Sequence, residues 1–386
     1  MEVKQIYELM NNVTEEILGE SALVNEDLSN IVDIGTSIFD ATSIDNYVKS
    51  LVNHIGKVIF VNRPYTGNVP NVLMDSWEFG SILEKISADI PEAEENESWE
   101  LTDRTSYDPN IFYKPTVSAK FFNKAVTFEV PMSFTEMQVK ESFSNAGQLN
   151  AFISMLYNAV DKSMTIKIDS LIMRTIDNMI GETLYDEMPS GTYTNTGVKA
   201  VNLLKLYNDR FGTTLTADNC ITDAEFIRFA SYTIGVYMSR LSKISTLFNI
   251  GGKERFTPAE YLNVVMLSDF MKSADAYLQS DVYHNEYTDL ANGKAISSVP
   301  YWQGSGTGYA WSDISKIKIK TASGHDITSP SILAVMFDRD ALGVTNEERR
   351  VTTNYNPKAE FFTNWTKFKC SYFNDTNENF VVFFVA

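Results

Sequence analysis

The feature that most constrains the fold is a single long helical pattern over about residues 145–180. Apolar side chains recur three and four positions apart, no proline interrupts them, and Gly181 stands where the helix would end. Such a helix would be about 50 Å long, whereas helices in globular proteins average about 11–12 residues. No second helical pattern matches it in length, which disfavours an ordinary bundle. We expect its core face to consist of Leu149, Phe152, Ile153, Leu156, Val160, Ile168, Leu171 and Ile172.

The residues before this helix do not predict a self-contained domain. Residues 1–42 carry weak helical periodicity and close on no core, which predicts an arm that is ordered by contact with something else. Residues 43–61 predict a short helix and a short β-like run. Residues 62–128 are dense in turn-forming dipeptides and have two extended legs and an acidic tip, so they predict a projecting hairpin. So long an excursion without a core is explained best if a neighbouring subunit completes its packing.

The residues after the long helix predict a mixed region that ends in strands. Helical patterns cover 198–211, 222–242 and about 268–283, and a short buried strand covers 261–267. Residues 284–312 predict a loop. The remaining strands are expected at 316–321, 331–337, 350–355, 365–372 and 380–385. The last of these is almost entirely apolar, which predicts an internal position in a sheet. The fold class is therefore α+β.

The charge of the chain argues against nucleic-acid binding as its main function. Its 50 acidic and 32 basic residues give a net charge of −18, which repels a phosphate backbone. The acidic cluster within residues 92–103 predicts a solvated loop rather than a metal site. Lys316, Lys318 and Lys320 alternate along one strand, which predicts a solvated strand face. A neighbour's acidic patch or DNA are the alternatives for that face.

No pattern in the sequence predicts catalysis. The two cysteines and three histidines stand far apart, which disfavours a structural zinc site, and no phosphate-binding or nucleophile motif has its required context. If the protein were a cytosolic enzyme, His284, Glu286 and Asp289 would be the first candidates for its site. No apolar run is long enough to span a membrane, and the first residues lack a signal peptide, so we expect synthesis and retention in a cytosol.

The order of these parts resembles the major capsid proteins of tailed bacteriophages, which have the Hong Kong 97 fold. Four stretches carry a closer resemblance to the phi 29 group of short-tailed phages. They are YVKSLVNHIG at 47–56, ILEKISADI at 82–90, FISMLYNAVD at 152–161, and the segment around Asn354, Tyr355 and Trp365. The shell fold extends to Ala386, so we expect no counterpart of the immunoglobulin-like domain that follows it in the phi 29 protein.

The resemblance implies a division of the chain into named parts. Residues 1–42 would be the N-terminal arm, 43–61 a helix and strand of the peripheral domain, and 62–128 the extended loop. Residues 129–196 would form the peripheral domain with the spine helix, 197–335 the axial domain, and 336–386 C-terminal strands that return to the peripheral domain. The expected subunit contacts on the loop are Trp77, Phe79, Ile82, Glu94, Glu95, Trp99, Phe112 and Tyr113.

The function implied is structural. Hexamers and pentamers would build a closed icosahedral or prolate shell around double-stranded DNA, without catalysis, cofactor, metal or membrane. A scaffolding protein and a portal would be partners, and packaged DNA would be contacted weakly and non-specifically. The protein would reside in the virion, and in the host cytoplasm during assembly. The alternatives are an encapsulin-like compartment and a cytosolic enzyme with a site around His284 and Glu286.

Overall fold

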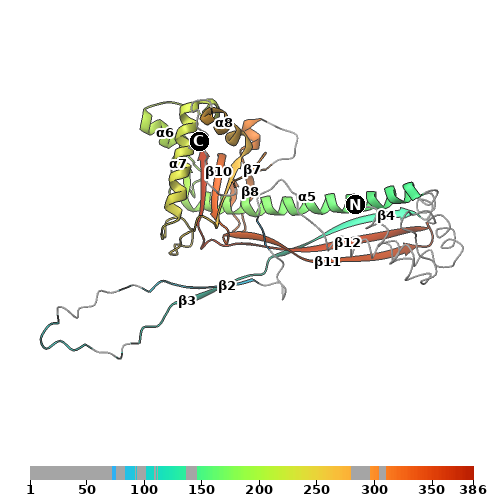
Figure 1. The fold of residues 1–386 in the computed structure, drawn as a ribbon, viewed down its shortest axis with the longest axis horizontal. Helices are drawn as coiled ribbons and strands as arrows, with labels where there is room; N and C mark the ends of the chain where they lie inside the picture. The colour runs from blue at the N-terminus through green and yellow to red at the C-terminus, as the bar shows by residue number, and fades with distance from the viewer. Residues whose placement is uncertain are drawn as a thin grey trace.

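The fold combines two main sheets, one very long helix and a projecting hairpin (Figure 1). The computed structural model describes residues 72–74, 83–91, 93, 101–107, 110, 112–135, 146–279, 296–303 and 310–386. The expected arm at 1–42 and the expected helix and strand at 43–61 lie outside these residues. The α+β class is confirmed. Among the described residues, none of the helices has the length and apolar character needed to cross a membrane.

The long helix α5 covers Ala146–Glu187 and runs along the body beside the strands of one sheet (Figure 1). Its length of 42 residues corresponds to about 63 Å. The side chains of Val160, Ile168, Leu171 and Ile172 are buried, as the helical spacing predicts. The side chains of Leu149, Phe152, Ile153 and Leu156 are outside the described set. Burial of this stripe, rather than intrinsic propensity, is what holds so long a helix straight against the body.

The prediction that Gly181 ends the helix is wrong. The helix continues to Glu187, and a short hairpin of β8 (Lys318–Lys320) and β9 (Asp326–Thr328) closes on it at Gly181. A Cβ atom on Gly181 would lie 2.8 Å from Cγ2 of Thr321 and 3.3 Å from Cγ2 of Ile319. This glycine is therefore explained by the close approach of a neighbouring element, which a periodicity argument does not see.

Replacing Gly181 with alanine is therefore expected to destabilise the subunit by about 1 kcal/mol, because overpacking outweighs the gain in helix propensity. Gly235 is the matched control, because it lies in the helix α7 (Ala224–Leu241) with no atom within 4 Å of its Cβ position. Gly235→Ala should stabilise by up to about 1 kcal/mol. Urea unfolding of both variants measures the two shifts. Shifts of the same sign would contradict this reading of Gly181.

The first sheet has the strand order β1-β11-β12-β4 and packs against α5. Its strands are β1 (Leu73–Met74), β11 (Leu342–Asn356), β12 (Phe361–Asn374) and β4 (Ala125–Thr135). Along β12 burial alternates, so that Phe362, Phe368 and Cys370 are buried while Trp365 and Lys367 point to the other face. The strands expected at 350–355 and 365–372 are longer than predicted, because β11 and β12 pair along almost their whole length.

The second sheet has the order β5-β13-β10-β6-β7 and holds the most apolar part of the core. Its strands are β5 (Ala200–Asn202), β13 (Phe380–Val385), β10 (Ser331–Asp338), β6 (Leu262–Leu267) and β7 (Ile296–Val299). The helices α6 (Leu203–Phe211), α7 and α8 (Ser268–Gln279) accompany it, with the short helices η3 (Cys220–Thr222) and α9 (Trp311–Ile314). The predicted internal position of 380–385 is confirmed, because β13 lies between β5 and β10.

Two sequence expectations differ from this sheet. β7 is a strand within the predicted loop 284–312, where its neighbours in sequence gave no strand pattern. The segment 336–386 does not return as one unit to the sheet beside α5. Its expected boundary falls inside β10, and while β11 and β12 join the first sheet, β13 crosses to the second. The residues between Asn374 and Phe380 therefore link the two sheets.

The third part is a separate antiparallel pair of strands, β2 (Leu83–Ala88) and β3 (Val117–Phe122). Leu83 pairs with Phe122 at one end and Ala88 pairs with Val117 at the other. This pair joins neither of the two main sheets, and it points away from the body (Figure 1).

Candidate functional site

The β2–β3 hairpin has two chemically different faces. In an antiparallel pair, directly opposed residues lie on the same face and alternate along each strand. The outer face carries Glu84 opposite Phe121, Ile86 opposite Ala119, and Ala88 opposite Val117. The inner face carries Leu83 opposite Phe122, Lys85 opposite Lys120, and Ser87 opposite Ser118. The strand residues of the outer face are exposed, and on β2 those of the inner face are half-buried.

Apart from Glu84, the outer face is apolar and exposed. The side chains of Ile86, Phe121 and Val117 are between 58% and 65% exposed. Eight of the seventeen large apolar side chains that are exposed among the described residues lie between Ile86 and Phe121. A short segment that concentrates so much apolar surface away from the body indicates a contact with another molecule.

The sequence prediction identified only part of this surface. Phe112 and Tyr113 are described and are 84% and 74% exposed, which leaves them available for contacts. The other six predicted contacts, Trp77, Phe79, Ile82, Glu94, Glu95 and Trp99, lie outside the described residues. The prediction missed Ile86, Val117 and Phe121. The alternation of Ile86 with Lys85 and of Phe121 with Lys120 was the available signal, because it separates one face of the hairpin from the other.

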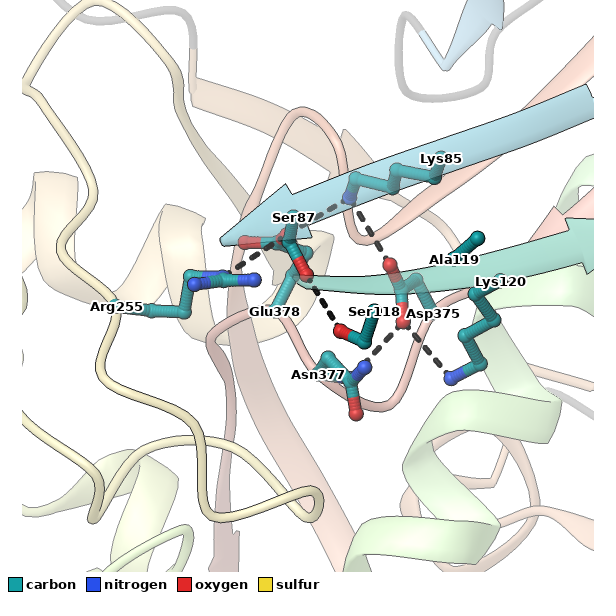
Figure 2. A pocket seen from close by; sticks show the side chains of 9 residues that line it. All are labelled: Lys85, Ser87, Ser118, Ala119, Lys120, Arg255, Asp375, Asn377 and Glu378. Atoms are coloured by element: carbon teal, nitrogen blue, oxygen red, sulfur yellow. Dashed lines mark hydrogen bonds and ion pairs between the residues drawn. The ribbon is translucent and has the colours of Figure 1, made fainter. Parts of the chain in front are cut away.

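The inner face rests on a cluster of charged residues at the base of the hairpin (Figure 2). Nζ of Lys85 lies 3.0 Å from Oδ2 of Asp375 and 2.8 Å from Oε1 of Glu378, and it also donates to the carbonyl of Asp340 at 3.1 Å. Nζ of Lys120 lies 2.9 Å from Oδ1 of Asp375. Nε of Arg255, from the loop before β6, lies 3.3 Å from Oε1 of Glu378.

Further polar contacts join the same surfaces. Nζ of Lys120 donates to Oγ1 of Thr376 at 3.0 Å. Near the end of β2, Nζ of Lys253 lies 2.8 Å from Oδ1 of Asp89. The hairpin is thus held against the link between the two sheets by ionic side-chain contacts.

The burial of its acids distinguishes this cluster from an ordinary surface ion pair. The side chain of Asp375 is only 3% exposed. Burial alone would raise its pKa, but the charge of Lys85 and the hydrogen bond from Lys120 outweigh burial and hold the pKa below its ordinary value of 3.8. Burial likewise tends to lower the pKa of Lys85, but the hydrogen bond to Glu378 and the charge of Asp375 raise it above 10.5. Both groups are therefore charged over the whole physiological pH range.

The stabilisation from Asp375 is expected to disappear in acid. A carboxylate with a lowered pKa in the folded state contributes stability above its ordinary pKa, and this contribution is lost as the pH falls through the lowered value. The urea midpoint of the wild-type protein should therefore exceed that of Asp375→Asn at pH 7, and the difference should shrink below about pH 4. A difference that stays constant from pH 7 to pH 3 would show that the carboxylate charge is not responsible.

A polar cavity of about 140 Å³ lies at this base, between the hairpin, Arg255 and the link between the sheets. The acidic groups that line it, Asp375 and Glu378, are paired with Lys85, Lys120 and Arg255. Within the described part of the chain, no three His, Cys, Asp or Glu side chains lie together so that they could hold a metal ion. The arrangement is suited to fixing one element against another.

The remaining candidates from the sequence have other roles or lie elsewhere. Cys220 and Cys370 are buried, and burial raises the pKa of each thiol to about 12, so neither is a reactive nucleophile. His284, Glu286 and Asp289 lie outside the described residues. Lys318 and Lys320 are exposed on β8, and Lys316 is exposed just before it.

The fold and this site define a class of protein. The chain has a long helix, two linked sheets and an exposed apolar hairpin that points away from the body, and such a hairpin favours contact with another molecule. The sequence model of the Phi29-like phage major capsid protein family matches residues 10–384. The chain belongs to this family, and it is therefore a structural protein whose copies assemble into the capsid shell of the virion.

The chain is also similar to chains in solved structures from phages. The chain is similar to a protein in the capsid structure of Staphylococcus phage Andhra, with 11% identity, a TM-score of 0.46, and coverage of 85% of this chain and 87% of that one. It is similar to a chain in the structure of the head fiber and inner core protein gp22 of bacteriophage P68, with 9% identity, a TM-score of 0.48, and coverage of 84% and 88%. No curated protein sequence matches the chain. The family assignment rests on the family model.

Proposed function

We propose that copies of this protein build a closed icosahedral or prolate shell around double-stranded DNA, and that the outer face of the β2–β3 hairpin is one of the contacts between copies. The observation that carries this proposal is the exposed apolar surface formed by Ile86, Val117 and Phe121, which lies on a hairpin directed away from the body. Burial of each such side chain contributes about 1.5–3 kcal/mol, and a shell repeats the contact many times.

The parts of the fold then take the roles that the family resemblance implies. The α5 helix with β4, β11 and β12 would be the spine and peripheral domain, and the five-stranded sheet with α6, α7 and α8 would be the axial domain. The β2–β3 hairpin would be the extended loop. Hexamers and pentamers would be the intermediate assemblies of such a shell.

The charge of the chain supports a container rather than a DNA-binding protein. A net charge of −18 repels the phosphate groups of packaged DNA, so contacts between the shell and the DNA would be weak and non-specific. The role would be structural without catalysis, as membership of a capsid protein family implies. A scaffolding protein and a portal would assist assembly in the host cytoplasm.

Electron microscopy of the purified protein tests this function directly. The protein is expressed alone and together with its neighbouring genes, and both preparations are imaged in negative stain. Closed shells or polyheads are the expected result. Shells that hold a cargo enzyme instead of DNA would favour an encapsulin-like compartment. Small discrete particles in both preparations would contradict the shell function and direct attention to His284.

A further inference from the structure

The opposed lysines Lys85 and Lys120 are an unfavourable pair within the hairpin. The two lysines are directly opposed on the inner face of the hairpin. Like charges at opposed positions destabilise an isolated antiparallel pair. The two lysines therefore do not stabilise the hairpin by itself. We look for their role in the residues that the inner face contacts.

The carboxylate of Asp375 lies between the two ammonium groups. Oδ2 is 3.0 Å from Nζ of Lys85 and Oδ1 is 2.9 Å from Nζ of Lys120, so one acid bridges two ammonium groups that come from two strands (Figure 2). The repulsion within the hairpin is thus relieved while the inner face is docked on Asp375 and Glu378. Docking and the internal stability of the hairpin are coupled through these acids, of which Asp375 is the one that contacts both lysines.

Asp375 is itself held rigidly. Its backbone N–H donates to the carbonyl of Ala341 at 2.7 Å, and its Oδ1 accepts from the backbone N–H of Asn377 at 3.0 Å. The neighbouring Thr376 carbonyl accepts from the N–H of Gly251 at 2.8 Å. The acid therefore stands on the link between β12 and β13, which is fixed to both sheets. Glu378 adds a second contact to Lys85 and is paired on its other side with Arg255.

We propose that Asp375, supported by Glu378, is a positioning residue that sets the direction in which the β2–β3 hairpin leaves the body and so places its apolar face for contact with a second copy of this chain. The effect on contact between copies rests on the proposed assembly function, whereas the direction of the hairpin does not depend on it. The described strands of the hairpin pair with neither main sheet, and only two residues separate β3 from β4, so we infer that side-chain contacts at the base act together with this short connection to fix its direction. The cluster around the buried Asp375 supplies several such contacts, to Lys85 on β2 and to Lys120 on β3.

The direction of the hairpin can be measured on dispersed subunits. Spin labels are attached at Ser106→Cys on the hairpin side and Lys243→Cys on the body, because the native cysteines are buried. Double electron–electron resonance should give one narrow distribution of the distance between the two labels when the rest of the chain is wild type. Asp375→Asn keeps the shape of the side chain but removes the acidic partner of Lys120 and leaves Lys85 with Glu378 alone. It should broaden the distribution and raise the concentration needed for assembly by about tenfold or more.

Removal of one lysine separates positioning from a general structural role. In the background of Asp375→Asn, Lys120→Met removes the repulsion and should restore a narrower distribution and part of the assembly. A merely structural defect in the link would not be rescued by a change on β3. Asp326→Asn, an exposed acid on β9, is the matched control and should leave both measurements unchanged.

The outcomes are distinguishable from those of the shell function. The distances are measured without assembly, so they test the positioning role even if the wild-type protein forms no shells. If wild-type shells form and Asp375→Asn matches Asp326→Asn in both distance distribution and assembly, the positioning role is wrong. A broadened distribution that Lys120→Met leaves unchanged would also overturn it.

Discussion

Phe121→Lys is expected to leave the subunit folded and to abolish shell assembly at concentrations that suffice for the wild-type protein. The side chain of Phe121 is exposed on the outer face of the hairpin, so no core is disturbed. Glu84 stands directly opposite, and an opposite-charge pair across the strands should preserve the hairpin. The assembly contact, in contrast, loses a large apolar group. A loss of about 3 kcal/mol per contact corresponds to about a hundredfold in affinity.

Light scattering during assembly measures this loss, with circular dichroism as a check on folding. Tyr232→Lys is the control, because Tyr232 is as exposed as Phe121 but lies on α7, away from the hairpin. If both variants assemble like the wild type, the outer face is not a subunit contact. If both fail equally, the effect is not specific to the hairpin.

The second large effect concerns the long helix. Ile172→Asp is expected to prevent folding of the soluble subunit, because Ile172 has no exposed surface and lies in the main core. An unpaired carboxylate there costs several kcal/mol, in addition to the lost packing, against a total stability of about 5–15 kcal/mol. Soluble yield and the thermal unfolding midpoint are the measurements.

The same helix supplies a matched control. Ile166 is less than two turns away from Ile172, but its side chain is exposed. Ile166→Asp makes the same chemical change and should alter stability by about 0.5 kcal/mol or less. Wild-type yield and midpoint for Ile172→Asp would show that this face of α5 is not the core.

Local patterns in the sequence predicted much of the fold. The period of apolar residues defined α5, and the uninterrupted apolar run at 380–385 predicted that β13 is internal. The end of α5 was missed because Gly181 is explained by Thr321, which is distant in sequence. The division of the last strands between two sheets was missed for the same reason, since strand order is a matter of long-range pairing.

The candidate site was less accessible to sequence reasoning than the fold. Turn residues and acidity pointed to a hairpin between 62 and 128, but not to which of its faces is apolar. Lys120 and Asp375 are 255 residues apart, and nothing near either residue in sequence indicates the other. Possible charge pairs are numerous in an acidic chain. Only the structure shows which acid is buried and contacts lysines on two strands.

The position of β13 in the second sheet determines when, during synthesis, the chain can complete its fold. β13 follows the other four strands of its sheet in chain order, yet it lies between β5 and β10. A nascent chain that has not reached Phe380 leaves a gap in the middle of this sheet, with unpaired edges on both sides. Domains generally fold as units during synthesis. We therefore expect that a partly made chain on a polysome does not join a growing shell, because its five-stranded sheet is complete only after Phe380–Val385 has been made.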